Sequence, residues 1–242
     1  MSMTSTETLI LEVADTQAAH TFYSAFVPGT RLSLRASQAP TTGFRGFALS
    51  LTVPRPADVD ALVAAALAAG ATTLKPASKS FWGYGGVVQA PDGTIWKVAT
   101  SAKRDSGPAT GRIDDLVLLL GTADVTASKR FYVEHGLAVA RSFGSKYVEF
   151  ATPASPFKVA LYGRRALAKD LGVPVDGTGS HRIVIGGTGG PFTDPDGFAW
   201  EAAVPAPAPT ASPRRPAPPP DPTARLPPGT TTRSSVARED LP

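Results

Sequence analysis

Side chains that could carry chemistry are few in this chain and unevenly spread. It contains no cysteine, which excludes a thiol nucleophile, disulfides, iron–sulfur clusters and cysteine-bound metal. Of its three histidines, His20 and His135 are expected at the surface of helices, and His181 precedes an expected strand. No Gly-x-Ser-x-Gly motif supports a serine nucleophile. The glycines at 83–86 and 186–190 lack the strand–loop–helix context of a phosphate-binding loop.

A group of aromatic side chains offers binding chemistry instead. Phe81, Trp82 and Tyr84 stand together before an expected hairpin, and large flat rings can stack on a planar ligand. Lys97 follows that hairpin, on the strand face opposite Trp96, because successive strand side chains alternate between faces. We therefore predict Trp82, Tyr84 and Lys97 as ligand-binding residues, with Lys97 supplying a positive charge. The alternative, that the aromatic side chains only cap the core or fill the seam between the two halves, stays open.

The composition indicates a globular protein. Hydrophobic residues make up 42% of the chain and charged residues 18%, which suits a buried core and not a disordered or collagen-like chain. No apolar run approaches the ~20 residues of a membrane helix, and the N-terminal residues lack a basic-then-apolar signal. We therefore expect a cytoplasmic protein with no membrane partner. The formal net charge of +4, without a basic stripe, gives no reason to expect a nucleic-acid partner.

Two parts of the sequence repeat one pattern. The segment Ala90-Pro-Asp-Gly-Thr-Ile-Trp-Lys97 matches Asp194-Pro-Asp-Gly-Phe-Ala-Trp-Glu201, and Phe22-Tyr23 matches Phe131-Tyr132 in the same order and at nearly the same offset. Such self-similarity indicates an internal duplication. Hydrophobic periodicity predicts helices over 16–26, 57–69 and 124–135, and strands over 7–14, 46–53, 72–75, 115–120, 146–150, 157–162 and 181–186. Each Pro-Asp-Gly sequence predicts a hairpin turn between two strands.

Composition sets the boundaries between these parts. The polar stretch 101–111 contains glycine and proline and predicts a linker. Dense proline in 204–242 predicts a disordered tail, because that segment cannot bury enough apolar surface to offset its ordering entropy. We therefore expect a first domain at 5–100 and a second, truncated domain at 112–203.

At these motifs the chain resembles the vicinal-oxygen-chelate superfamily, which includes glyoxalase I, bleomycin-resistance proteins and extradiol dioxygenases. The resemblance covers about residues 7–203 and rests on the Phe-Tyr helices and the Pro-Asp-Gly-x-x-Trp closings. It implies an α+β fold of tandem glyoxalase-like domains, each built from paired βαβββ units with a curled mixed sheet around a cup. The stretch between Leu34 and Phe47 is too short for a complete first unit. The second half passes from 181–186 almost directly to its closing hairpin, so a helix and a strand are expected to be missing there.

The resemblance also implies where a metal would bind. In the first half, the family's ligand positions fall on Thr8, on a residue near 46–47 and on Lys97, and none of these suits a divalent cation. No His, Asp, Glu or Cys occurs between Thr21 and Ala57. We therefore expect no cofactor in the first half.

In the second half, the corresponding positions carry Asp115, His181 and Glu201. One histidine and two carboxylates suit a divalent metal, although Asp115 stands where the family usually has a histidine. An alternative stays open for each residue: Asp115 ends a strand in solvent, His181 bonds to backbone, and Glu201 pairs with an arginine such as Arg182 or Arg141.

Two functions follow from the resemblance. The first is a glyoxalase- or bleomycin-resistance-like protein that binds a small organic molecule in its cup, without metal in the first half. The alternative is a lyase, isomerase or dioxygenase with a divalent metal on the second half. A third reading, an interaction protein acting through its proline-rich tail, ranks last. The two halves are expected to pack as an internal pseudo-dimer, and a homodimer is left open.

Overall fold

The computed structural model describes residues 6–30, 32–152 and 155–202. Within these ranges the chain forms fifteen strands and four helices, and all of them belong to one compact unit, Met1–Val204. No helix in the described part has the length and apolar character needed to cross a membrane. The proline-rich tail predicted at 204–242 lies outside the described residues.

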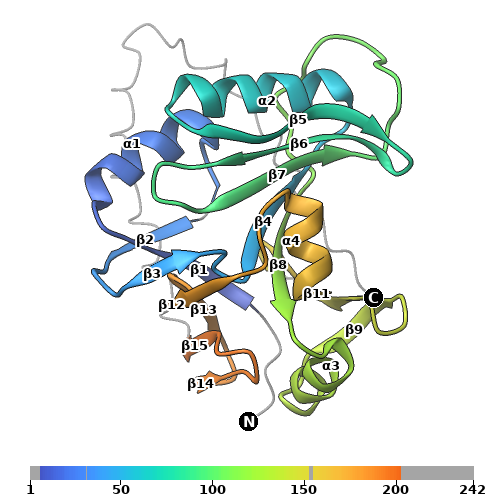
Figure 1. Ribbon diagram of the computed structural model, residues 1–242. Helices are drawn as coiled ribbons and strands as arrows, with labels where there is room; N and C mark the ends of the chain where they lie inside the picture. The colour runs from blue at the N-terminus through green and yellow to red at the C-terminus, as the bar shows by residue number, and fades with distance from the viewer. Residues whose placement is uncertain (1–5, 31, 153–154, 203–242) are drawn as a thin grey trace, which may run out of the picture. The chain divides into compact units, whose positions relative to one another are not determined.

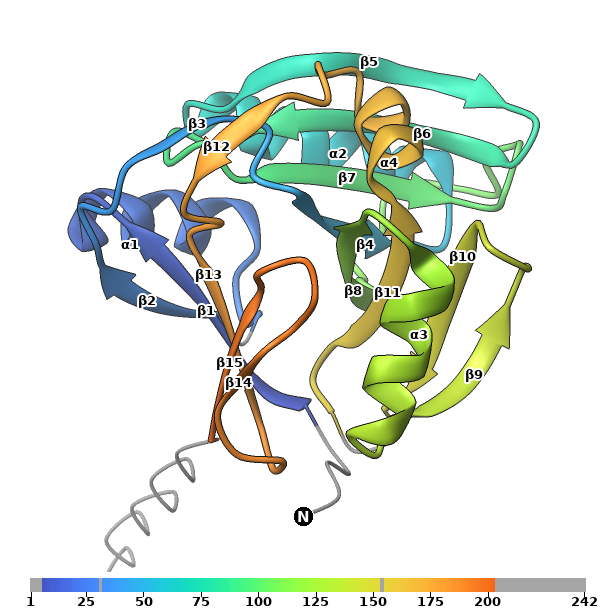
Figure 2. The same ribbon diagram turned by 60° about the horizontal axis from the view of Figure 1, so that its bottom comes forward.

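Eight strands form the larger of two curled sheets, which bends from β5 to β9 (Figures 1 and 2). In spatial order they are β5 (Thr72–Ser80), β6 (Gly83–Gln89), β7 (Ile95–Thr100), β4 (Phe47–Thr52), β8 (Asp115–Thr122), β11 (Lys158–Gly163), β10 (Tyr147–Ala151) and β9 (Ala138–Ser142). Strands β4–β7 with α2 (Pro56–Ala68), and strands β8–β11 with α3 (Val125–Glu134), are two complete βαβββ units. Their opening strands, β4 and β8, pair antiparallel at the centre of the sheet.

The second curled sheet has five strands and combines two reduced units. In spatial order they are β14 (Phe192–Thr193), β15 (Ala199–Ala202), β13 (Ile183–Gly187), β1 (Thr6–Val13) and β2 (Leu32–Ala36). Here β2 pairs parallel with β1, as a closing strand does, so the first unit lacks its two middle strands. Between β13 and β14 the described residues form no helix. Both predicted shortenings are therefore confirmed. A separate two-stranded ladder joins β3 (Thr41–Gly43) to β12 (Gly177–Gly179).

The expectation that each half would form its own paired sheet is wrong, because the units pair across the halves. The second unit of the first half pairs with the first unit of the second half in the eight-stranded sheet. The two reduced units, at opposite ends of the described chain, pair through β1 and β13. The physical reason is that an opening strand has an unpaired edge that needs a partner. The two complete units pair their opening strands with each other, and the two reduced units then pair theirs.

The repeated sequence motif joins the two sheets. Tyr23 of α1 (Thr16–Phe26), the helix after β1, donates a hydrogen bond of 2.7 Å to Asp92 in the hairpin between β6 and β7. Tyr132 of α3 donates one of 2.5 Å to Asp194, which lies between β14 and β15. The following tryptophans, Trp96 and Trp200, are buried against these tyrosine rings. Each copy of the motif therefore connects a helix of one sheet to the closing hairpin of the other.

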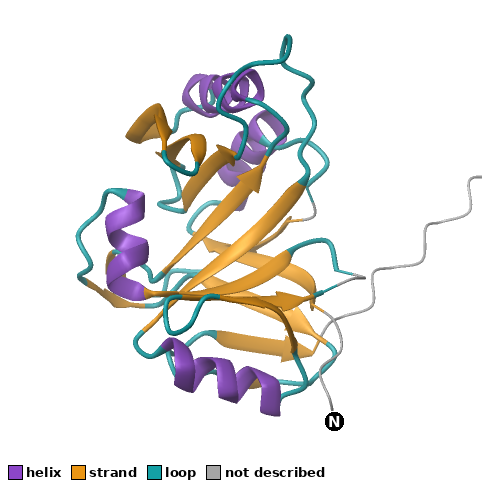
Figure 3. Cartoon of the chain, turned by 90° about the vertical axis from the view of Figure 1, so that its right-hand side faces the viewer, coloured by secondary structure: helices purple, strands orange, loops and turns teal. Residues whose placement is uncertain are grey.

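A fourth helix, α4 (Arg164–Leu171), lies on the concave face of the eight-stranded sheet. Figure 3 shows it on the opposite side of that sheet from α2 and α3. Its Leu167, Ala168 and Leu171 are buried in an apolar cluster separate from the main core, and this cluster includes Val117 and Ala160 of the sheet. The helix ends at Gly172, whose left-handed backbone (φ +80°) suits a residue without a side chain. Helix α4 therefore fills part of the cup formed by the eight-stranded sheet.

Candidate functional site

The three residues predicted as metal ligands lie apart, and two of them are in ion pairs. Asp115 begins β8 in the eight-stranded sheet, where its carboxylate lies 2.8 Å from Lys158 Nζ. Glu201 lies on β15 in the five-stranded sheet and accepts two hydrogen bonds from Arg35, of 2.8 and 2.7 Å. The expectation that Glu201 would pair with an arginine is confirmed, but the partner is Arg35 because the curled sheet brings β2 within reach of β15. These hydrogen bonds from Arg35 lower the pKa of Glu201.

His181 contacts backbone carbonyl groups, as the alternative to metal binding predicted for this residue. Its Nδ1 lies 2.5 Å from the carbonyl oxygen of Arg45, and its Nε2 lies 3.1 Å from that of Asp196. The ring stacks on Phe198 with 4.1 Å between ring centroids. Both ring nitrogens therefore lie against backbone carbonyl oxygens, which leaves neither of them open to a cation.

The described residues hold no group of three His, Asp, Glu or Cys side chains that could bind a metal ion. The central row across the eight-stranded sheet runs Lys97–Ser50–Val117–Lys158, from β7 through β4 and β8 to β11. Two ammonium groups, one hydroxyl and one apolar side chain do not make a divalent cation site. In the five-stranded sheet, Thr8 pairs with Gly186, and neither is a strong ligand. The donor sets present in the described residues thus do not fit a divalent metal.

A cavity of about 220 Å³ opens on the concave face of β5, β6 and β7, beside the end of α4. All three residues predicted to bind a ligand, Trp82, Tyr84 and Lys97, line this cavity. Its floor includes Gly85 of β6 and Ala99 of β7, which pair directly across the two strands. A side chain at Gly85 would place its Cβ only 2.8 Å from the Val98 carbonyl oxygen, so the sheet itself keeps this floor bare.

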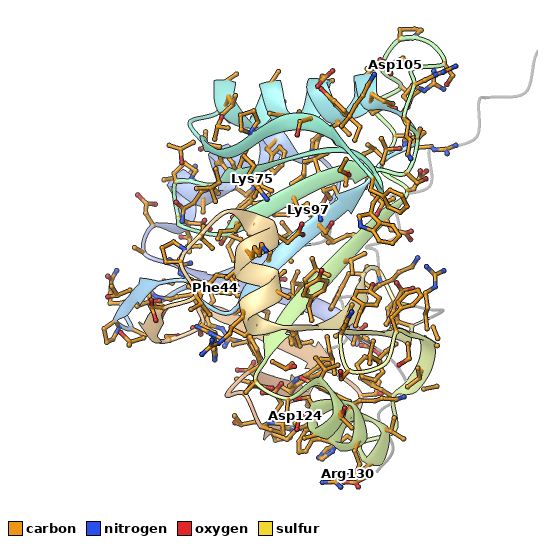
Figure 4. The ribbon with its side chains drawn as sticks, turned by 45° about the vertical axis from the view of Figure 1, so that its right-hand side comes forward. Phe44, Lys75, Lys97, Asp105, Asp124 and Arg130 are labelled. Atoms are coloured by element: carbon orange, nitrogen blue, oxygen red, sulfur yellow. The ribbon has the colours of Figure 1, made fainter. Side chains whose placement is uncertain are left out.

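Three charged side chains line the cavity: Lys75 of β5, Lys97 of β7 and Asp170 of α4. Lys97 Nζ lies 2.5 Å from Asp170 Oδ2. Lys75 Nζ donates to the carbonyl oxygens of Lys169 and Asp170, at 3.3 and 2.7 Å. Figure 4 shows Lys75 and Lys97 close together beside α4. The partial negative charge at the C-terminal end of α4 and its aspartate thus face two ammonium groups.

The aromatic side chains divide between the cavity mouth and the opposite face of the sheet. Phe81 and Trp82 form the turn between β5 and β6 and are 78% and 83% exposed, with their rings in a T-shaped contact. Tyr84 packs against the main core, and its hydroxyl donates 2.8 Å to Asp60 of α2. The Tyr84 side chain therefore points away from the cavity, and Trp82 is the ring available to a ligand at the mouth.

Two other hollows of the surface are lined by residues different from those of this cavity. One of about 580 Å³ runs between the outer side of α1 and β2, and one of about 630 Å³ lies around Asp115 and Lys158. Both are larger, but the first has His20 and Tyr23 as its titratable residues, and the second has its ammonium group already paired with a carboxylate. The cavity beside α4 is smaller and combines opposing charges, a bare floor and an exposed aromatic ring.

Two residues that complete this set with Lys97 were not predicted from the sequence: Lys75 and Asp170. Asp170 lies on α4, for which no helix was predicted. The signal was present in Leu167 and Leu171, four residues apart, followed by a glycine stop at Gly172.

Solved structures with a similar fold include glyoxalase I from Zea mays, with a TM-score of 0.50 and 16% identity over 81% of this chain and 90% of that chain. A variant of that enzyme gives a TM-score of 0.51 and 15% identity over 81% and 90%. A protein of Bacillus subtilis subsp. subtilis str. 168, provisionally described as a dioxygenase, gives 0.50 and 12% over 77% and 70%. No protein-family model matches the sequence, and no curated protein matches it.

At these identities the likeness shows the fold, and the activities of those proteins stay their own. The likenesses extend over both sheets, because more than three quarters of this chain is covered. The chain therefore has the vicinal-oxygen-chelate fold, built here from two complete and two reduced units.

Proposed function

We propose that this protein binds a small planar organic molecule in the cavity on β5, β6 and β7, without a metal ion. The observation that carries the proposal is the bare Gly85–Ala99 floor lying between Lys97 and the exposed ring of Trp82. Exposed tryptophan is uncommon on a surface with no partner, because its large apolar ring gains by burial. A flat ligand would cover part of the Trp82 ring and rest on the backbone of β6.

The size of the cavity limits the ligand. Its volume of about 220 Å³ lies below the roughly 300 Å³ at which pockets for drug-sized molecules begin. One or two rings with a polar substituent fit this limit. The polar atoms that would fix the orientation are the ammonium groups of the lysines and the hydroxyl group of Ser78, which also lines the cavity and pairs with Gly85.

The alternative of a metal-dependent lyase, isomerase or dioxygenase finds no support in the described side chains. Asp115 and Glu201 are held by Lys158 and Arg35, and His181 by two backbone carbonyl groups. A metal would have to break these contacts and gather residues from two different sheets. We therefore propose binding rather than metal-assisted catalysis. The cytoplasmic location stays a prediction from the sequence, and a homodimer stays open.

A ligand-observed NMR screen of one- and two-ring compounds, with EDTA present, tests this proposal. Hits should bind the wild-type protein and should lose binding in Ala99→Leu, because the larger side chain fills the space above the floor. Ala138→Leu, on the exposed strand β9, is the matched control and should bind normally. Hits that bind Ala99→Leu as well as wild type, or that require a divalent metal, would contradict the proposal.

A further inference from the structure

The charged residues of the cavity indicate the chemical class of its ligand, provided that the proposed function holds. We propose that Lys75 and Lys97 form a site for the carboxylate of a small aromatic acid, and that Asp170 of α4 occupies this site while the ligand is absent.

One lysine already holds a carboxylate, and the other lies beside it on the backbone of the same residue. Asp170 Oδ2 lies 2.5 Å from Lys97 Nζ, and the Asp170 carbonyl oxygen lies 2.7 Å from Lys75 Nζ. Two ammonium groups, on β5 and β7, thus converge on one aspartate at the end of a helix. Short contacts of this kind between ammonium groups and oxygen are charge-assisted hydrogen bonds.

The charge balance leaves room for one more anion. Two lysines and one aspartate are the charged side chains that line the cavity, so its lining carries a net charge of +1. A carboxylate ligand would neutralise this charge, whereas a cationic ligand would increase it. Charge complementarity therefore favours an acid.

The Lys97–Asp170 pair can be exchanged at little cost. The side chains of Lys97 and Asp170 are 30% and 36% exposed, so water already reaches both groups. Ion pairs at such positions contribute little to stability, because solvent screens them and both side chains can be hydrated separately. An incoming carboxylate can take the place of Asp170 at Lys97, and Asp170 can turn to solvent.

The rest of the cavity fits the ring of the acid. The Gly85–Ala99 floor lies on the same face as Lys97, because Val87 pairs with Lys97 and Gly85 with Ala99. Trp82 lies at the mouth, where an aromatic edge or face contact is available. A carboxylate attached directly to a ring would meet Lys97 while its ring covers this floor.

Three probes of one shape and different charge test the inference: benzoate, benzamide and benzamidine, titrated by calorimetry at low ionic strength. We expect benzoate to bind at least about tenfold more tightly than benzamide, and benzamidine to bind most weakly. Asp170→Asn should tighten benzoate binding several-fold, because the competing carboxylate is gone. Tighter binding of benzamidine than of benzoate, or weaker benzoate binding in Asp170→Asn, would overturn the inference and leave the proposed function standing.

Lysine variants complete the test. Lys97→Met should reduce benzoate binding to the level of benzamide, and Lys97→Arg should restore most of it. Lys79→Met changes the net charge equally on the same sheet, but Lys79 is exposed and does not line the cavity, so benzoate binding should be unchanged. Equal benzoate loss in Lys79→Met and Lys97→Met would overturn the inference. Absence of binding by all three probes to the wild-type protein would contradict the proposed function as well.

Discussion

The two halves of the eight-stranded sheet share one βαβββ arrangement, but their concave faces carry side chains of different size. In the half made by β4–β7, the fifth residue of the closing strand is Ala99, and it pairs with Gly85. In the half made by β8–β11, the fifth residue of the closing strand is Tyr162, and it pairs with Tyr147. The two tyrosine rings meet in a T-shaped contact with centroids 6.0 Å apart. A cavity is present where the first half has glycine and alanine, and rings occupy the space in the second.

The difference separates a βαβββ unit that carries the proposed binding cavity from a neighbour whose concave face is packed. In the β8–β11 half, Val117 and Ala160 pack against α4, and the tyrosines extend that apolar surface. Burial raises the pKa of Tyr147, and the neighbouring Glu149 raises it further, so this hydroxyl stays a hydrogen-bond donor at ordinary pH. The second half therefore supports α4, and α4 presents Asp170 to the cavity in the first half.

The largest expected effect comes from removing a buried contact between α2 and the linker that connects the two halves. Asp58 of α2 is buried and accepts hydrogen bonds from the backbone and hydroxyl of Thr110 and from the Gly111 backbone, in the linker before β8. Asp58→Ala leaves these donors without their partner and should lower the free energy of unfolding by about 3 kcal/mol, measured by urea titration. A loss below about 1 kcal/mol would mean that the linker does not depend on Asp58.

The same residue gives a pH dependence with a defined sign. Burial acts to raise the pKa of Asp58, but the hydrogen bonds from Thr110 and Gly111, together with the charge of Arg55, outweigh it and lower that pKa. A carboxyl with a lowered folded-state pKa stabilises the fold above its unfolded pKa, about 3.9, and loses that contribution as the pH falls through the folded value. The stability difference between wild type and Asp58→Ala should therefore shrink below about pH 4. A difference that stays constant as the pH falls well below 4 would contradict the assignment.

A matched pair of substitutions tests the contrast in filling directly. Ala160, fully buried beneath α4, has no room for a larger side chain, so Ala160→Leu should cost about 2 kcal/mol of unfolding free energy. Ala99 lies on the cavity floor, so Ala99→Leu should change stability by less than about 1 kcal/mol. Equal losses of unfolding free energy in urea titrations of the two variants would show that Ala99 is packed as tightly as Ala160.

The smallest expected effect concerns the cavity mouth. Trp82 is 83% exposed, so Trp82→Ala should change the unfolding free energy by less than about 0.5 kcal/mol. Trp96 and Trp200, the other two tryptophans, are buried. The variant should therefore lose the red-shifted part of the fluorescence emission and keep the blue-shifted part. A stability loss comparable to that of a buried tryptophan would place Trp82 in the core instead.

Much of the fold could be predicted because its signals are local. The helix over 16–26 was predicted at the bounds it has, since its apolar residues recur at helical spacing, and Asp15 caps its start. Strand alternation predicted Trp96 in the core and Lys97 on the opposite face, and both are confirmed.

The pairing of units and the assembly of the site depend on contacts between distant segments, which the sequence does not specify. Asp115 and Glu201 belong to different sheets because the units pair across the halves, and no local pattern near either residue encodes that choice. Helix α4 is short, begins with two arginines and has a narrow apolar face, so its pattern was overlooked, and Asp170 with it. Lys75 was overlooked because its role depends on α4.

A crystal structure of the protein with benzoate tests the central claim most directly. The account predicts the ring over Gly85 and Ala99, the carboxylate at Lys97 and Lys75, and Asp170 turned away from Lys97. Benzoate bound at the Tyr147–Tyr162 half, or at another surface while Lys97 and Asp170 remain paired, would contradict it.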